Sequence, residues 1–436
     1  MVKIKLPIIL LIAFWVLAPA GDTRIAAGEP SESLPYGVNL TLHKAQKFIE
    51  SSQIPKAIEL LETSLTRHKS GYDHYLVHFT LGNCCMLEKR LPEALVHYQA
   101  SLKLKEDFPE AWLNLAKCFY DSAKFADAGR CFIRAYDTAE SGQALTLYYA
   151  GLSWLQAKEP RKASDILQKL IDTHDTADPH FDWKEALVQA YIDSDRPRNA
   201  LPYIEELSEK TTGKKKKQWQ EIRLFQYMSL QMNDRAKTYA GFLVKEYPLQ
   251  SKWWKILAQM HLTEHDYESG LTTFTVYSFL APLNEEEMLL MAELNTAVDI
   301  PVQAAEWYER LNQKEPDLDT TCRLAQCYLN LHDSPRALET VQNAQKRYDS
   351  KKLNMLKGQI LFEMKRYAEA MTAFESITAS HPDQGDAWLM MGYAAFNAEQ
   401  FQKAKTAFNR ASTFTSHRAT AKRFLKQLEA IIHRKG

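Results

Sequence analysis

The chain has 436 residues, of which 45% are hydrophobic and 25% are charged, a composition typical of a soluble helical protein. Its 54 basic and 54 acidic residues give a formal net charge of zero at pH 7. Nucleic-acid-binding proteins carry a broad positive field, so this balance predicts no nucleic-acid partner. The one basic run, Lys214–Lys217, is expected to be a solvated linker.

The amino terminus has the three parts of a secretory signal peptide. Lys3 and Lys5 precede an apolar stretch over residues 6–18, and Ala18-Pro19-Ala20 forms an Ala-x-Ala cleavage site. We expect cleavage after residue 20, with an alternative site after Ala27.

Residues 21–37, rich in Gly, Pro, Ser and Glu, are expected to form a flexible leader. The protein is therefore expected to be exported, with a bacterial periplasm as its compartment. Retention of residues 6–18 as an uncleaved inner-membrane anchor is the alternative, although this stretch is short for a bilayer span. No second stretch is apolar enough to cross a membrane.

From about residue 38, a small residue recurs every 33 to 37 positions, and a large apolar residue follows it four positions later in all copies but one. The small residues are Ala57, Ala94, Ala128, Ala163, Ala200, Ala236, Gly270, Ala304, Ala337, Ala370 and Ala404. The exception is the copy in which Ala240 follows Ala236. A fixed period of this length indicates small units stacked in a line and not one globular core.

The clearest copy, residues 109–140, contains two apolar stripes with helical spacing. The first stripe comprises Trp112, Leu115, Ala116 and Phe119. The second comprises Ala128, Phe132 and Ala135. Positions i, i+3, i+4 and i+7 share one face of an α-helix, so each unit is expected to be a pair of helices joined by a short polar turn.

This pattern resembles the tetratricopeptide repeat (TPR), whose signature is Trp-x2-Leu-Gly-x2-Tyr, then Ala-x3-Phe, then Pro. Eleven copies in phase cover residues 38–416. They start near Val38, Tyr75, Pro109, Ala144, Phe181, Lys217, Ser251, Glu285, Leu318, Lys351 and Gly385. The resemblance implies an all-α fold, an α-solenoid of about eleven helical hairpins in a right-handed superhelix.

Two parts of the chain depart from the repeat pattern. Lys184 and Arg223 occupy positions that the family fills with apolar residues, so the fifth and sixth units match it least. Residues 417–436 carry an apolar stripe flanked by basic residues and are expected to form a helix that caps the last repeat. The stripe comprises Phe424, Leu428, Ile431 and Ile432. A membrane-binding or partner-binding helix is the alternative.

The six cysteines do not form a disulfide framework. Cys84 and Cys85 are adjacent, and Cys322 and Cys327 lie on one predicted helix. Only Cys118 and Cys131, on the two helices of one unit, are placed to meet, and the sequence leaves their pairing open. There is no Cys-x2-Cys and no pair of histidines at ligand spacing, so no metal site is expected.

The sequence contains no motif for catalysis or cofactor binding. It has no glycine-rich phosphate loop, no His-Glu-x2-His, no Gly-x-Ser-x-Gly and no kinase motifs. His78 and His261 occupy helix-packing positions and are expected to be structural. We therefore expect a protein that is not an enzyme and has no cofactor.

In TPR proteins the first helices of successive repeats line the concave side, and the resemblance places partner-binding residues there. The ninth position of these helices carries five glutamines, which could hydrogen-bond an extended peptide; a simple preference for helix formation is the other explanation. Aromatic and aliphatic residues form two further clusters, which either bind a partner or pack between repeats. The expected groove residues are Phe79, Asn83, Leu113, Asn114, Lys117, Tyr120, Tyr148, Tyr149, Leu152, Gln189, Gln259, Gln326, Gln359, Met355, Phe362, Met390, Tyr393 and Phe396.

One known TPR binding mode is excluded. Asn83 and Asn114 match the two asparagine positions of the chaperone-type carboxylate clamp. Its basic positions are filled by Phe79, Leu145 and Tyr149, which cannot compensate a desolvated carboxylate. A cochaperone role of that kind is not expected.

The expected function is a non-catalytic scaffold that binds one or more proteins of the bacterial cell envelope. It would hold an extended peptide or a partner helix in its groove, as an assembly factor or accessory subunit of an envelope, secretion or energy-coupling machine. The alternative is a receptor for cell-wall or other carbohydrate. The aromatic residues available for it are Tyr120, Tyr148, Tyr149, Trp112 and Trp388.

Overall fold

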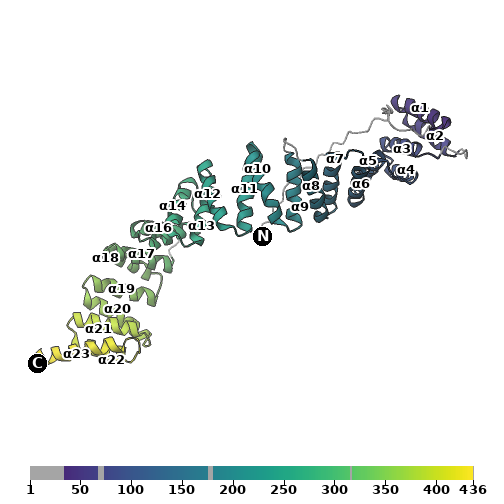
Figure 1. Cartoon of the computed structure of the whole chain (residues 1–436). Coiled ribbons are helices and arrows are strands. Elements are labelled where there is room, and N and C mark those ends of the chain that lie inside the picture. Colours follow the sequence, from purple (N-terminus) through teal and green to yellow (C-terminus); the bar gives the residue numbers. More distant parts are fainter. Residues whose placement is uncertain (1–33, 67–72, 175–179, 315–316, 436) are drawn as a thin grey trace. The chain divides into compact units, whose positions relative to one another are not determined.

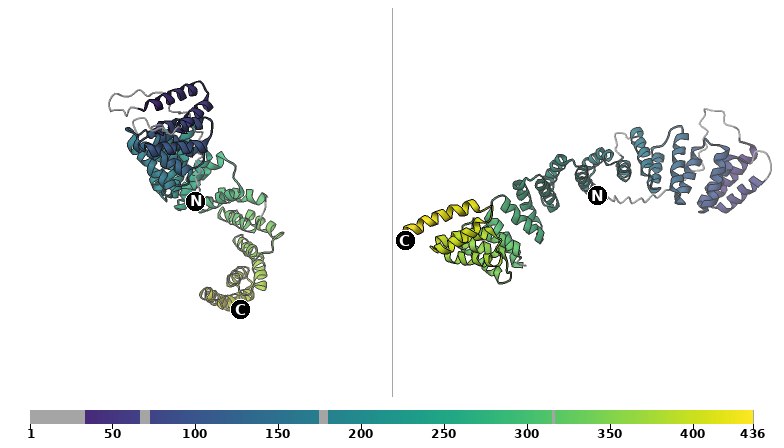
Figure 2. Two further views of the ribbon diagram at one scale, coloured as in Figure 1. Left: turned by 90° about the vertical axis from the view of Figure 1, so that its right-hand side faces the viewer. Right: turned by 90° about the horizontal axis from the view of Figure 1, so that it is seen from below.

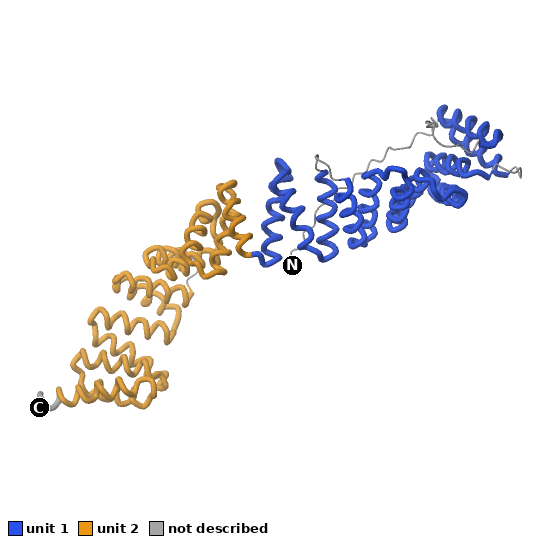
Figure 3. The backbone as a smooth tube through the Cα atoms, in the orientation of Figure 1, with its two compact units in different colours: residues 1–232 blue, residues 233–436 orange. Residues whose placement is uncertain are grey.

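The computed structural model describes residues 34–66, 73–174, 180–314 and 317–435, and all of its regular elements there are α-helices. The expected signal peptide and nearly all of the expected leader lie outside these residues. The chain divides into two compact units, residues 1–232 and 233–436, each described by itself (Figure 3).

Unit 1 contains five helical hairpins and one further helix, and each helix packs on the next along the chain (Figure 1). The helices are α1 (Tyr36–Glu50), α2 (Ile54–Thr66), α3 (Tyr75–Leu87), α4 (Leu91–Leu104), α5 (Pro109–Asp121), α6 (Phe125–Thr138), α7 (Ala144–Gln156), α8 (Pro160–His174), α9 (Phe181–Asp193), α10 (Pro197–Lys210) and α11 (Gly213–Ser229).

Unit 2 begins with one helix and continues with five hairpins and a terminal helix, again packed in chain order (Figure 2). The helices are α12 (Asn233–Glu246), α13 (Ser251–Thr263), α14 (Tyr267–Leu280), α15 (Glu285–Ala297), α16 (Pro301–Lys314), α17 (Leu318–Asn330), α18 (Ser334–Gln345), α19 (Lys351–Glu363), α20 (Tyr367–Ser380), α21 (Gly385–Asn397), α22 (Phe401–Ser412) and α23 (Arg418–Lys435). The border between the units falls between α11 and α12, the two helices of the sixth predicted repeat.

The predicted all-α fold of paired helices is confirmed. In nine of the eleven repeats, the residue expected to start the repeat is the first residue of a helix, as at Tyr75, Pro109 and Lys351. The first helix begins two residues before Val38 and α11 begins four residues before Lys217. The helix α23 packs against α22 and buries Ala421 and Leu428, as expected for a cap.

The turn inside each repeat ends the first helix in one recurrent way. A residue with φ between 56° and 61° lies just beyond the end of the helix. Its backbone N–H and that of the next residue donate to carbonyls in the last turn of the helix. In the second repeat Lys89 donates to the Met86 carbonyl at 3.0 Å, and Arg90 donates to the Cys85 carbonyl at 2.8 Å. This is the Schellman motif, whose left-handed residue is usually glycine. None of the eleven here is glycine: they are Ser52, Lys89, Ala123, Lys158, Asp195, Gln231, His265, Asp299, His332, Lys365 and Glu399.

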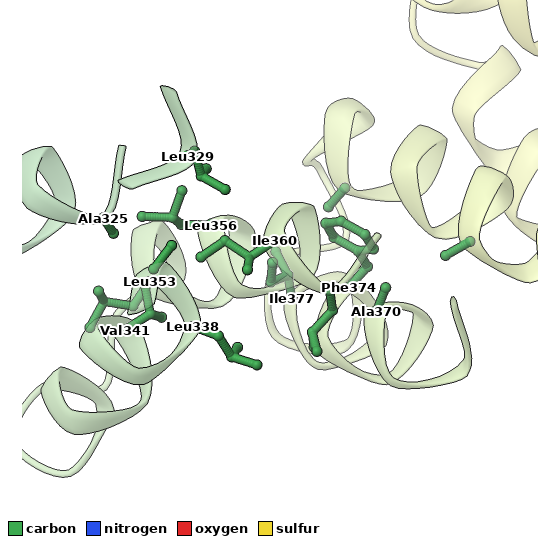
Figure 4. Packing of buried hydrophobic residues seen from close by; sticks show 14 of the residues in the cluster. Ala325, Leu329, Leu338, Val341, Leu353, Leu356, Ile360, Ala370, Phe374 and Ile377 are labelled. Carbon is green, nitrogen blue, oxygen red and sulfur yellow. The ribbon is translucent and has the colours of Figure 1, made fainter. Parts of the chain in front are cut away.

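The core of each unit repeats with the sequence. The small residue early in each second helix is buried, which lets the two helices of the hairpin approach closely. In repeat ten, a Cβ added to Gly358 of α19 would lie 2.5 Å from the ring of Phe374 on α20. Apolar side chains from α17 to α20 form one continuous core, shown in Figure 4.

The two unusual polar residues are accommodated by pairing. Lys184, with 4% of its surface exposed, donates from Nζ to both carboxylate oxygens of Glu206 at 2.8 and 2.9 Å. Burial acts to raise the pKa of Glu206, but the hydrogen bonds from Lys184 and Lys210 outweigh it and hold that pKa below its usual value. Arg223 donates to the hydroxyls of Tyr227 and Ser208 and to the carboxylate of Glu209.

The prediction that the basic run is a linker is wrong. Residues 214–217 are the second to fifth residues of α11, close to its amino terminus, where positive side chains oppose the helix dipole. Lys215 offsets part of this cost, because its Nζ lies 2.9 Å from Glu185 and 3.4 Å from Asp182 on α9. No helix among the described residues is both long and apolar enough to span a bilayer.

All six cysteines are buried free thiols, so the structure does not contain the Cys118–Cys131 disulfide that the sequence left open. The Sγ of Cys118 lies 3.4 Å from the carbonyl of Leu91. Burial raises the pKa of Cys118 to about 11 and that of Cys131 to about 12. Such thiols stay protonated near neutral pH and react slowly.

Candidate partner-binding surface

The first helices of unit 1 carry a row of half-buried aromatic residues. Phe79 on α3 contacts Phe108 with ring centroids 4.8 Å apart, and Tyr120 on α5 contacts Phe125 at 5.1 Å. On α7 the rings of Tyr148 and Tyr149 lie 5.9 Å apart. Burial raises the pKa of Tyr148 to about 12. These side chains, and Leu113 of α5, pack against the core with one part and leave another part accessible.

Several expected groove residues of unit 1 are used inside the fold. Asn83 is buried, and its Oδ1 accepts hydrogen bonds from the Tyr98 hydroxyl at 2.7 Å and from Asn114 Nδ2 at 2.8 Å. The two asparagines that match the clamp pattern therefore bind each other. Leu152 is only 1% exposed and belongs to the core.

The two remaining polar residues of this surface are half-buried. Lys117 lies on α5 and Gln189 on α9. The Oε1 of Gln189 is buried and accepts no hydrogen bond within the described residues.

In unit 2 the first helices α17 and α19 contact each other and form the walls of an open pocket of about 530 Å³. Its lining includes three predicted groove residues: the glutamines Gln326 and Gln359 and the apolar Met355. The lining residues are Asp319, Cys322, Arg323, Gln326, Lys351, Lys352, Met355, Leu356 and Gln359. Its volume is in the range of about 300–1,000 Å³ that is usual for ligand sites.

Charged residues tie three successive first helices together beside this pocket. Arg323 of α17 lies 2.8 Å from Glu293 of α15 and 2.9 Å from Asp319. Lys352 of α19 lies 2.6 Å from the other oxygen of Asp319. Hydrogen bonds from Lys352 and Arg323 hold the pKa of Asp319 below its usual value, and the Asp319 carboxylate raises the pKa of Lys352.

The apolar cluster at the end of unit 2 is partly covered by the cap. The ring of Phe424 on α23 lies 4.8 Å from Tyr393 and 6.1 Å from Phe396 on α21. Met390 and Phe362 are half-buried against the same core. Gln259 is exposed on α13, outside the pocket lining. The expected residues of unit 2 therefore lie in four places. Gln326, Gln359 and Met355 line the pocket, and Tyr393 and Phe396 contact the cap. Phe362 and Met390 pack on the core, and Gln259 stands apart.

The tryptophans of the repeats have a structural role. Trp112, Trp254 and Trp388 share one repeat position, and each indole N–H donates to the carbonyl six residues earlier. The distances are 2.9, 2.8 and 3.0 Å respectively. These hydrogen bonds fix the turn between repeats, and they occupy the polar atom that a sugar ligand would otherwise contact.

The charged lining of the pocket was not among the predicted groove residues, which came from the ninth repeat position and from two clusters of aromatic and aliphatic residues. The second position carries a charged residue in five successive repeats of unit 2, and both signs occur there. These residues are Lys252, Glu286, Asp319, Lys352 and Asp386. Opposite charges at one position of neighbouring first helices predict ion pairs between them, as found between Asp319 and Lys352.

Among the described residues, no group of three or more His, Cys, Asp or Glu side chains is arranged to hold a metal ion.

Family models match parts of both units. Tetratricopeptide repeat models match residues 42–111, 145–177 and 361–428. A model described as anaphase-promoting complex, cyclosome, subunit 3 matches residues 302–377. No curated protein matches the chain.

Solved structures similar to this chain share little sequence with it. The structure of Naa15/Naa10 bound to HypK-THB is 15% identical over 90% of this chain and 61% of that chain, with a TM-score of 0.42. This chain thus spans about three fifths of that protein's length. Yeast Tom70 is 16% identical over 91% of this chain and 96% of that chain, with a TM-score of 0.32. A tetratricopeptide repeat protein from Parabacteroides merdae ATCC 43184 is 14% identical over 60% of this chain and 100% of that chain, with a TM-score of 0.34.

Paired helices with the repeat's small and aromatic residues at fixed positions occur in both units, and tetratricopeptide repeat models match in each. The chain is a multi-repeat TPR protein.

Proposed function

We propose that this TPR protein is an exported, non-catalytic scaffold of the bacterial cell envelope that holds an extended segment of a partner protein. One observation carries the proposal. The first helices α17 and α19 form an open pocket in which two predicted groove glutamines stand beside apolar side chains. Protein–protein interaction is the general activity of TPR proteins, and the envelope partner is the specific part of the proposal.

The side chains around the pocket suit a peptide better than a small polar metabolite. Gln326 and Gln359 are exposed amides at the same position of neighbouring repeats, and each offers both donors and an acceptor to a main chain. Met355 is half-buried beside them, so a side chain of the partner gains apolar contact there. Repeat spacing and amide pairing together favour an extended chain that runs across successive first helices.

Export is supported by the signal-peptide pattern over residues 1–20 and by the state of the thiols. Six cysteines in an oxidising compartment would risk wrong disulfides if they were accessible. All six are buried, and burial raises the pKa of Cys84 to about 12. A chain with its thiols protected in this way tolerates a periplasmic location.

The carbohydrate alternative is weaker. Two of its five aromatic residues, Trp112 and Trp388, already donate their indole N–H groups to backbone carbonyls. The remaining tyrosines pack partly against the core of unit 1. These contacts favour a protein partner over a carbohydrate.

The binding proposal is tested by photocrosslinking in the native cells. A photoreactive amino acid replaces Gln359 in one strain and Val302, an exposed residue of α16 away from the pocket, in another. We expect an envelope protein to crosslink to the Gln359 position and not to the Val302 position. Equal crosslinking at both positions, or none at Gln359, contradicts binding at this pocket.

Export needs its own measurement. The mass of the purified protein and its distribution between cell fractions are determined in the native cells. A periplasmic protein that begins at residue 21 or 28 supports the proposal. A cytoplasmic protein that retains residues 1–20 overturns the envelope location but leaves the scaffold function untouched.

A further inference from the structure

We propose that the partner segment bound between α17 and α19 inserts one apolar side chain into the pocket and places one carboxylate beside Lys351. This inference rests on the proposed function, since it specifies the chemistry of the segment that the scaffold binds. Three features of the pocket support it: an apolar floor, amide groups on the walls, and the charges around it.

The floor of the pocket is apolar. Cys322 of α17 and Leu356 of α19 are 6% and 8% exposed, and Met355 beside them is half-buried. Burial raises the pKa of the Cys322 thiol, so this group stays neutral. A charged side chain placed on this floor would lose its hydration without gaining a partner, whereas an aliphatic or aromatic one would gain contact area.

The walls offer amide groups. Gln326 donates from Nε2 to Asn330 at 3.1 Å, which leaves its carbonyl oxygen exposed to accept a further hydrogen bond. Gln359 makes no side-chain hydrogen bond within the described part of the chain. Donor and acceptor groups side by side match the N–H and C=O groups of an extended main chain.

Four of the charges around the pocket cancel one another. Glu293 and Asp319 are each paired with Arg323, and Asp319 is also paired with Lys352, so these two anions and two cations sum to zero. A ligand rich in acid would face Asp319 and Glu293, and a ligand rich in base would face Arg323 and Lys352. The network therefore selects against strongly charged segments of either sign.

Lys351 is the charge that remains. It lines the pocket at the first residue of α19 and has no ion-pair partner among the described residues. The positive end of the α19 dipole adds to its field, and both favour a negative group at this place. One carboxylate next to one apolar anchor is the ligand that complements an apolar floor and a single uncompensated cation.

The test uses the purified full-length mature protein and a display library of random short peptides as the probe. Selection on the native protein is expected to enrich peptides in which one large apolar residue lies at a fixed spacing from one Asp or Glu. Lys351→Glu is expected to weaken the binding of these peptides by at least about tenfold, because repulsion of the peptide carboxylate replaces attraction. On that variant, selection should favour Lys or Arg in place of the acid.

The matched control is Lys357→Glu, which reverses a charge on the same helix at a residue outside the pocket lining. We expect it to leave affinity unchanged within about twofold, since Lys357 is outside the pocket and salt screens charges that do not contact the peptide. Met355→Asp should abolish binding, whereas Met355→Leu should preserve it. Circular dichroism melting of every variant checks that the fold is retained. If Met355→Asp fails to fold, Met355→Leu and Lys351→Glu still test the site.

The outcomes separate this inference from the proposed function. Enriched peptides with several acids, several bases or no apolar anchor overturn the inference, even if the photocrosslink at Gln359 captures an envelope protein. An unchanged affinity of Lys351→Glu also overturns it. If neither the library nor the cells yield binding at this pocket, the proposed function fails as well.

Discussion

The first-helix surfaces of the two units use the same repeat position in opposite ways. In unit 1 the ninth-position residue Asn83 is buried and binds the hydroxyl of Tyr98 on the second helix. In unit 2 the ninth-position residue Gln359 is exposed, and the residue equivalent to Tyr98 is Phe374, which has no hydroxyl. In these two repeats, the polar residue at the ninth position is buried where the second helix provides a hydroxyl to bind it, and is exposed where the second helix provides none.

One ion pair from each unit shows the same contrast. Unit 1 contains the buried pair of Lys184 and Glu206, whose side chains are 5% and 23% exposed. Unit 2 displays its network on the surface, where the side chains of Arg323 and Asp319 are 45% and 55% exposed. Polar groups of the first kind hold the fold, and those of the second kind remain available to a ligand. The predictions that follow test this contrast.

The largest expected effect separates the two ion pairs. Glu206→Gln leaves Lys184 buried without its counter-ion and is expected to lower the free energy of unfolding by about 3–5 kcal/mol. Asp319→Asn removes an exposed charge and is expected to cost less than about 1 kcal/mol. Urea denaturation followed by circular dichroism measures both variants. Similar losses in the two variants would remove the contrast between buried and displayed pairs.

The next prediction exchanges the aromatic residues that decide the ninth position. Tyr98→Phe removes one of the two hydrogen bonds that Asn83 Oδ1 accepts, leaves the one from Asn114, and should destabilise the protein by about 0.5–1.5 kcal/mol. Phe374→Tyr adds a hydroxyl at the equivalent position, where Gln359 could turn inward to bind it. We expect this variant to bind the selected peptides more weakly while Tyr98→Phe leaves peptide affinity unchanged. Fluorescence titration and thermal melting distinguish the two effects.

The repeat turns should respond alike in both units. Lys89→Gly and Lys365→Gly each relieve a non-glycine residue held at a φ near 60°. Each is expected to stabilise the protein by about 0.5–1 kcal/mol, after the greater freedom of glycine in the unfolded chain is subtracted. The check is the midpoint of urea unfolding. If only one of the two variants were stabilised, the gain in the free energy of unfolding would depend on tertiary contacts and not on the local backbone conformation.

The smallest effect is a pH dependence of unit 1. His97 Nδ1 lies 3.4 Å from His78 Nδ1, and His78 Nε2 lies 3.0 Å from Asp73. Burial lowers the pKa of His97, the charges of His78 and Arg90 lower it further, and Glu93 acts in the opposite direction.

In the unfolded chain His97 binds a proton below the usual histidine pKa of about 6.5, whereas in the folded protein it binds the proton only at a lower pH. The stabilising contribution is fully present above that pH and is lost as the pH falls towards the lower pKa of the folded protein. Thermal melting between about pH 7 and pH 5 should show this loss, and His97→Gln should reduce its slope. An unchanged slope would assign the acid sensitivity to other groups.

Much of the fold could be read from the sequence, because its causes are local and periodic. The spacing of small and aromatic residues defined the hairpins, and the starts of repeats such as Tyr75 and Lys351 were assigned to the residue. The misplaced element was Lys214–Lys217, where charge composition indicated a linker but α9 provides acidic partners for Lys215 in a helix. Propensity at that point was overruled by contacts with residues about thirty positions away.

The candidate site was only partly predictable. Gln326, Gln359 and Met355 were expected in the groove and line the pocket, whereas Leu152 and Asn83 were expected there and are buried. The repeat position identifies the helix face. Whether a residue on that face is free depends on the size and hydrogen-bonding groups of the residue opposite, which periodicity does not encode.

The sequence by itself thus determined the unit, its number and the faces of its helices, since each follows from residues within one repeat or its nearest neighbour. Only the tertiary structure decided that Asn83 binds Asn114, that Asp319 joins Arg323 to Lys352, and that Lys351 lines the pocket without an ion-pair partner among the described residues. The physical reason is that hydrogen bonds and ion pairs require atoms within about 3–4 Å. A repeat pattern brings helices together, but the side chains at each contact determine which atoms meet.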